Sequence, residues 1–75
     1  MTVKRGVYRH FKGNLYFVHE VAIDAESEAP REVVIYEPLY GEPNRRFVRS
    51  VSNFRETVNR PELGYEGPRF YPVYT

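Results

Sequence analysis

The residues of this chain that are suited to chemistry are arginines and aromatic side chains rather than nucleophiles or metal ligands. There is no cysteine, which excludes disulfides, thiol catalysis and zinc–thiolate sites. The two imidazoles, His10 and His19, are too few for a tetrahedral metal site, which needs at least three protein ligands. We therefore expect neither a metal nor a cofactor.

Patterns that support catalysis are also missing. None of the serines stands in a nucleophile elbow. The glycines at positions 64 and 67 lack the following Lys-Ser/Thr pair of a phosphate-cradling loop. Acids such as Glu26 and Glu28 fall in a predicted loop, where burial is too slight to tune a carboxyl group for acid–base work. We expect no enzymatic activity, and a hydrolase is the least favoured hypothesis.

Tyrosine and arginine together form the best candidate for a functional surface. Seven tyrosines and five phenylalanines are more rings than so small a core can enclose, so some must lie near the surface. Exposed tyrosine beside arginine offers stacking for bases, cation–π contacts or a groove for an extended peptide. The competing explanation is structural: half-buried tyrosines line the rim of the fold, and their hydroxyl groups are hydrated by solvent rather than bound to a ligand. The residues expected to bind a ligand are Tyr8, Arg9, His10, Lys12, Tyr36, Tyr40 and Arg49.

The leading function hypothesis is a noncatalytic binding or adaptor module that takes a peptide or a single-stranded nucleic acid. The alternative is a sponge or sensor for a small anionic or phosphorylated metabolite, with Arg9, Lys12 and Arg49 supplying the charge. Affinity for nucleic acid falls steeply with salt, whereas affinity for a peptide in an apolar groove depends on salt weakly. The sequence leaves the oligomeric state open.

Charge is distributed unevenly along the chain, although the formal net charge is only +1. Basic residues dominate 1–13 and 43–60, while acidic residues dominate 20–42. If the two basic segments fold onto one side, the protein has a positive face and a negative edge. A net charge near zero argues against strong nonspecific binding to nucleic acid, yet a local basic patch permits a modest site.

Short β-strands must position these side chains. Glycine and proline interrupt the chain at short intervals, and the runs between them are rich in Val, Ile, Tyr and Phe, which is typical of small antiparallel β structure. We expect one domain over residues 1–75, an all-β, small SH3-like five-stranded barrel with one short helical turn before the last strand. The strands are expected near 6–12, 15–23, 32–40, 46–51 and 69–74, with a loop over 59–68.

The first two strands are expected to form a hairpin that turns at residues 13–14, where a glycine supplies the positive φ of a type II′ turn. In that register Tyr8 faces His19 and His10 faces Phe17. These four side chains then share one face of the sheet.

A single helical turn is expected to start at Asn53, because asparagine is a good N-cap and Glu56 follows three positions later, as in a capping box. An ion pair between Arg49 and Glu56 is expected to fix this turn against the sheet. The residues expected to matter for structure are Gly6, Gly13, Gly41, Asn53, Phe54 and Glu56.

No membrane segment is expected. The longest apolar runs, over 15–18 and 33–36, are far too short to cross a bilayer. Residues 1–13 contain no apolar signal-peptide core. We expect a soluble, cytoplasmic domain.

Several stretches of the chain form a pattern found in a known family. They are Gly6-Val7-Tyr8-Arg9-His10-Phe11-Lys12-Gly13, then Tyr16 and Val18, Tyr36-Glu37-Pro38-Leu39-Tyr40-Gly41, Phe47-Val48-Arg49, Phe54, Glu56 and Pro68-Arg69-Phe70. Over about residues 6–73 the chain resembles a bacterial family of small proteins, the domain of unknown function DUF-1653. The family tends to have His-Ser-Glu-Thr after Ala22, where this chain has Asp24-Ala25-Glu26-Ser27. The resemblance implies a small β domain and brings no established activity, cofactor or partner.

Overall fold

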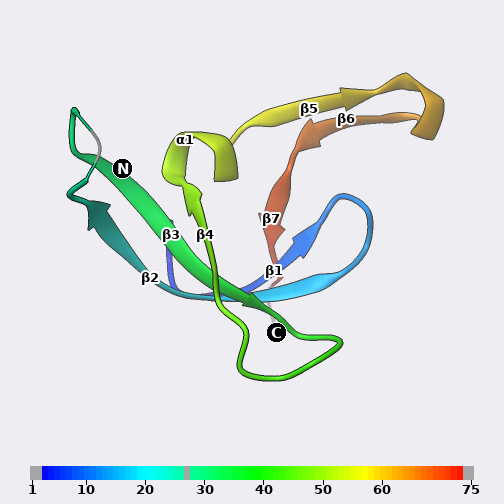
Figure 1. Ribbon diagram of the computed structural model, residues 1–75. Coiled ribbons are helices and arrows are strands. Elements are labelled where there is room, and N and C mark those ends of the chain that lie inside the picture. Colours follow the sequence, from blue (N-terminus) through cyan, green and yellow to red (C-terminus); the bar gives the residue numbers. More distant parts are fainter. Residues whose placement is uncertain (1–2, 27, 74–75) are drawn as a thin grey trace.

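The computed structural model describes residues 3–26 and 28–73. It consists of a curved sheet, a separate two-stranded hairpin, one short helix and a 3₁₀ turn (Figure 1). No helix in these described ranges is long and apolar enough to cross a membrane. The elements are β1 (Gly6–His10), β2 (Leu15–Asp24), β3 (Arg31–Pro38), β4 (Phe47–Ser50), α1 (Val51–Phe54), β5 (Thr57–Arg60), η1 (Pro61–Leu63), β6 (Tyr65–Pro68) and β7 (Phe70–Pro72).

The main sheet is antiparallel, with its strands in the order β4-β3-β2-β1-β7. The prediction of a small, mostly β domain is confirmed. The prediction of a closed barrel is wrong, because β4 and β7 form the two edges of the sheet and do not pair with each other in the described chain. The segment expected as a loop forms the β5–β6 hairpin instead, and β7 is only three residues long. The SH3-like relationship itself stays a prediction.

The β1–β2 hairpin has a different register from the expected one. Tyr8 faces Tyr16 rather than His19. The turn is a three-residue loop, in which the Gly13 N–H donates to the His10 carbonyl at 2.7 Å. Gly13 has a φ of +112°, as the glycine that closes such a loop requires. The resulting odd shift exchanges the two faces of β2 relative to β1.

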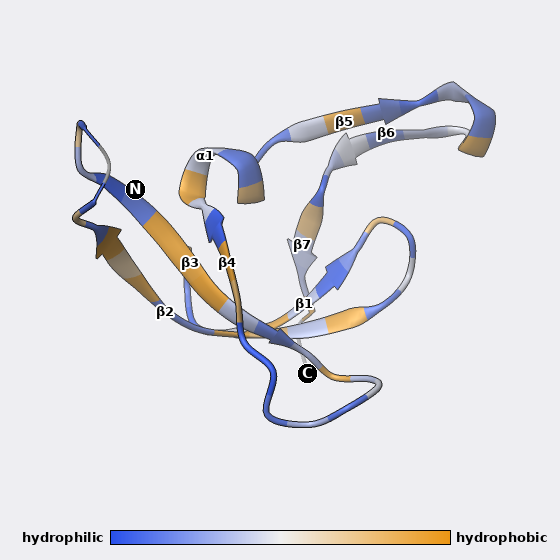
Figure 2. Cartoon of the chain, viewed as in Figure 1, coloured by the Kyte–Doolittle hydropathy of each residue, from blue (hydrophilic) through white to orange (hydrophobic). Residues whose placement is uncertain are grey.

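The core is built from large rings on the inner face of the sheet. Phe54 and Phe70 lie parallel with ring centroids 4.2 Å apart, and Tyr8 and Tyr36 meet Phe54 edge-on at 5.4 and 5.7 Å. Such ring pairs each stabilise by about 0.5–1.5 kcal/mol beyond area burial. Figure 2 shows hydrophobic residues along the middle of β3 and a hydrophilic stretch leading into β4. The clustered buried residues are Tyr8, Val18, Val34, Tyr36, Phe54 and Phe70.

The helix α1 begins earlier than expected. Ser50 is its N-cap, and its Oγ accepts a hydrogen bond from the Asn53 N–H at 3.1 Å. The predicted cap at Asn53 is therefore wrong, because serine at the end of β4 is an equally good cap and stands first. Glu56 pairs with Arg69, so the expected ion pair between Glu56 and Arg49 is not formed.

Removing the hydroxyl of Ser50 tests this start of α1. Ser50→Ala is expected to lower the free energy of unfolding by about 1 kcal/mol, because the cap satisfies a helix N–H. In a domain of this size Tm then falls by roughly 4–8 °C, which thermal circular dichroism measures. Ser52→Ala, at an exposed position inside α1, removes only the 3.3 Å contact between the Ser52 and Ser50 hydroxyls and leaves the capping bond. It is the matched control and should change Tm little. Equal losses in the two variants would contradict the assigned cap.

Candidate functional site

Polar side chains gather around the ring of Phe70 on the inner face of the sheet. Phe70 lies beside His10 of β1, and their rings meet edge-on at 4.9 Å. Tyr16 of β2 meets the same ring at 5.5 Å, and the guanidinium carbon of Arg49 of β4 lies 5.6 Å from its centre. Phe70 is buried and forms a floor shared by the three. We call His10, Tyr16, Arg49 and the neighbouring Tyr40 the donor cluster.

Arg49 is fixed from two sides. Its Nε donates to the hydroxyl of Tyr36 at 3.0 Å, and one terminal nitrogen donates to the amide oxygen of Asn53. No acidic side chain within residues 3–26 and 28–73 forms an ion pair with it. The guanidinium is thus oriented in advance and carries no neutralising carboxylate, which suits a carboxylate or phosphate group of a ligand.

The hydroxyls of Tyr16 and Tyr40 lie 2.8 Å apart. Burial raises the pKa of Tyr16 to about 12, with a further contribution from its hydrogen bond to Tyr40. Tyr16 therefore keeps its proton at neutral pH. One hydroxyl of the pair donates to the other, which leaves one O–H able to donate to a ligand. Tyr40 is 44% exposed, so this end of the donor cluster opens to solvent.

His10 adds a neutral donor. Its Nδ1 accepts a hydrogen bond from the backbone N–H of Lys12 at 3.1 Å, which places the ring proton on Nε2 in the neutral form. Burial lowers the pKa of His10 below its usual 6.5, and the positive charges of Arg49, Arg69 and Lys12 lower it further. The positive charges that add to this effect of burial on the His10 pKa are also charges that attract an anion.

The direction of this pKa predicts how stability depends on pH. Because the folded state disfavours the imidazolium form, the unfolded chain takes up the proton first as the pH falls. The contribution of His10 is therefore fully present above pH 6.5 and is lost as the pH falls from about 6.5 through the lower folded-state pKa. Denaturant unfolding of His10→Gln should lack this part of the pH dependence. Proton NMR of the ring should give a midpoint below 6.5, and a higher midpoint without ligand would contradict the burial of the ring and the positive charges around it.

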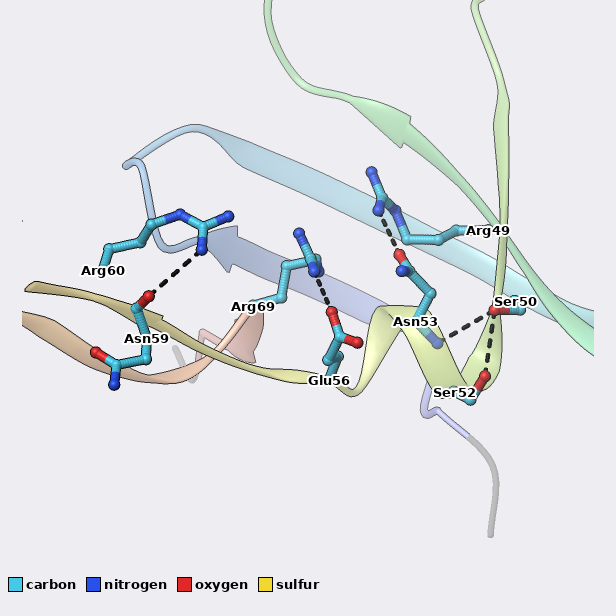
Figure 3. A network of polar contacts seen from close by, with 8 residues as sticks. All are labelled: Arg49, Ser50, Ser52, Asn53, Glu56, Asn59, Arg60 and Arg69. Carbon is cyan, nitrogen blue, oxygen red and sulfur yellow. Dashed lines mark hydrogen bonds and ion pairs between the residues drawn. The ribbon is translucent and has the colours of Figure 1, made fainter.

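Arg69 adds a second guanidinium next to the donor cluster. A terminal nitrogen pairs with Glu56, while Nε is buried without a hydrogen-bond partner among the described residues. Figure 3 shows the guanidinium ends of Arg49, Arg69 and Arg60 on the same side of the segment formed by α1 and β5. Of these three cations only Arg69 forms an ion pair with a described acid, so this side of the segment keeps an excess of positive charge.

The structure brings together four of the seven residues predicted to bind a ligand, namely His10, Tyr36, Tyr40 and Arg49. Tyr8 lies in the core, where it is 8% exposed and its hydroxyl donates to the Lys4 carbonyl. Arg9 alternates with Tyr8 along β1 and so lies on the opposite face, where it donates to the Gly13 carbonyl. Lys12 lies in the β1–β2 turn, next to the donor cluster rather than within it.

The residues that the sequence predicted to bind a ligand do not include Tyr16, Arg69 and Phe70. The correct hairpin register places Tyr16 on the face of Tyr8, so a three-residue turn would have found it. Arg69 and Phe70 belong to a stretch that carries the family resemblance. The family resemblance of that stretch was therefore the signal that could have pointed to these two residues.

Metal ligands do not gather in residues 3–26 and 28–73, where no three His, Cys, Asp or Glu side chains are close enough to hold an ion. The two histidines do not share a face as expected, because the register differs. His19 pairs with Glu37 and packs edge-on against Phe17 at 4.9 Å, on the face opposite to His10.

Fold and site together define a small, mostly β domain whose inner face is lined by rings and hydrogen-bond donors. The chain matches the family model described as "Protein of unknown function (DUF1653)" over residues 6–72, and it belongs to this family. Its fold is similar to the crystal structure of a DUF1653 protein from Bordetella bronchiseptica, with a TM-score of 0.81 and 32% sequence identity. That similarity covers 95% of this chain and 87% of the other. Comparison with curated proteins found no match.

Proposed function

We propose that this protein is a noncatalytic binding module that holds an anionic group of its ligand, a carboxylate or a phosphate, at the donor cluster. The observation that carries the proposal is an oriented Arg49 without an acidic partner in the described chain. The Nε2–H of His10 and the free hydroxyl proton of the Tyr16–Tyr40 pair add neutral donors. Such donors match the lone pairs of an anion and offer little to a cation.

An extended ligand suits this arrangement better than an enclosed metabolite. Small-molecule sites usually bury about 70–90% of the ligand's surface. The donor cluster opens to solvent at Tyr40, so an anionic side chain or backbone group projecting from a larger partner reaches it. This supports a binding or adaptor role over that of a metabolite sponge.

A two-dimensional amide NMR titration tests the proposal. Sodium phosphate and sodium acetate are added separately to the wild-type protein at constant ionic strength, with sodium chloride as the reference. We expect amide shifts at residues 10–12, 40 and 49–53, and none at the acidic end of the β2–β3 hairpin. If neither anion shifts the amides of the donor cluster more than chloride does, the proposed function is wrong.

A further inference from the structure

A hollow lies next to the donor cluster, at the turn between β1 and β2. Its volume is about 560 Å³, and we call it the turn hollow. That volume falls within the range of about 300–1,000 Å³ that is usual for ligand pockets. The residues that line it are Phe11, Lys12, Arg60, Glu62 and Leu63.

The turn hollow combines an apolar surface with two cations. Leu63 is 58% exposed although it is a large hydrophobic residue. The guanidinium carbon of Arg60 and the ammonium of Lys12 lie 5.6 and 5.9 Å from the ring centre of Phe11. Neither cation forms an ion pair with an acid of the described chain. The hollow therefore offers one contact for an aliphatic side chain and another for a carboxylate.

The turn hollow adjoins the donor cluster through Phe11 and Lys12, which line the hollow and contact His10. The rings of Phe11 and His10 have centroids 4.5 Å apart, and the Lys12 N–H donates to the His10 ring. The Phe11 N–H donates to the Arg69 carbonyl at 3.0 Å. Arg60 and Arg49, one at each site, lie on the same side of the chain segment between them in Figure 3. The two sites are therefore neighbours, and their cations lie on the same side of that segment (Figure 3).

We propose that the occupant is an acidic, leucine-containing peptide segment, whose aliphatic side chain enters the turn hollow while its carboxylates meet Arg60 and the donor cluster. This inference rests on the proposed function, because it takes the donor cluster as the second anion contact. It adds the class of the ligand and a subsite that selects for an apolar side chain.

A peptide fits the turn hollow better than single-stranded nucleic acid does. A stacked base needs a free ring face, but Phe11 already stacks on Tyr65 at 5.4 Å and has cations near its ring. The exposed Leu63 also offers an apolar contact that a leucine side chain can use and a sugar-phosphate backbone cannot.

The test uses fluorescence anisotropy of a labelled octapeptide in which leucines alternate with glutamates. A second octapeptide has serine at each leucine position, and an octamer of thymidylate serves as the nucleic acid. We expect the leucine peptide to bind about tenfold more tightly than the serine peptide, because a buried aliphatic side chain contributes on that scale. Leu63→Ser should remove this difference. Arg60→Gln should weaken binding of the leucine peptide about tenfold. The matched control Arg31→Gln, at the end of the β2–β3 hairpin, should not weaken it.

Peptide binding tests this inference, whereas the amide response to phosphate tests the proposed function. In Leu63→Ser and Arg60→Gln the amide response of the donor cluster to phosphate should persist, since neither residue belongs to that cluster. Equal affinity of the wild-type protein for the two peptides, or no binding of either, would overturn the peptide inference. If the amides of the donor cluster still respond to phosphate, the proposed function is unaffected. The inference would be overturned in favour of nucleic acid if the thymidylate octamer bound more tightly than the leucine peptide and its affinity fell steeply with salt. Loss of the phosphate response in wild type is the separate failure of the proposed function.

Discussion

Replacing Arg49 by glutamine is expected to weaken binding of inorganic phosphate by roughly ten- to a hundredfold. Arg49 is the guanidinium of the donor cluster that no described acid neutralises. A hydrogen bond to a charged group contributes about 1.5–3 kcal/mol, and each 1.4 kcal/mol corresponds to about tenfold in affinity. The amide NMR titration with phosphate measures the change directly.

Two matched variants separate the charge of Arg49 from its structural contacts. Tyr36→Phe removes the hydroxyl that accepts from the Arg49 Nε but keeps the cation, so most of the affinity should remain. Arg46→Gln removes the same charge from an exposed loop position and should alter affinity little. Thermal unfolding of each variant checks that the fold is intact. If Arg46→Gln and Arg49→Gln weaken binding equally, general surface charge and not the donor cluster attracts the anion.

The short runs of β-branched and aromatic residues and the turn residues between them are sufficient to predict a small β domain. They do not predict the register and pairing of its strands. The expected strands over 15–23 and 32–40 correspond closely to β2 and β3, because long runs of β-branched and aromatic residues are strong local signals. The predicted register of β1 is wrong, because the glycine at 13 fits both a two-residue and a three-residue turn and only tertiary packing chooses between them. The β5–β6 hairpin escapes prediction because its four-residue strands carry too little pattern.

The candidate site is predictable only where local sequence signals place the strands that carry it. Arg49, Tyr36 and Tyr40 belong to β4, β3 and the connection between them, whose positions the local signals predict well, so their proximity follows. Tyr8 is expected at a rim and lies in the core, since composition shows that some rings are exposed but not which ones. The position of Arg69 depends on β7 pairing with β1, a contact between segments far apart in the sequence that no local pattern reveals.

Replacing Phe54 by alanine is expected to destabilise the fold severely. Phe54 is 2% exposed, stacks on Phe70 and meets Tyr8 and Tyr36 edge-on. It is the buried residue of α1, so its ring joins the helix to the sheet. Truncation of a buried phenylalanine costs about 3–5 kcal/mol, while a chain of this length has a total stability of roughly 4–11 kcal/mol.

The loss should appear as a fall in Tm of roughly 12–40 °C, since each kcal/mol shifts a domain of this size by about 4–8 °C. Phe54→Leu keeps most of the volume, so its Tm should fall much less. Val48→Ala is the control at a position that is 65% exposed, where a change within about 0.5 kcal/mol is expected. Because Phe54 stacks on Phe70, the floor of the donor cluster, Phe54→Ala should also lose its phosphate response wherever it remains folded. A Tm near that of Val48→Ala would show that α1 does not close the core.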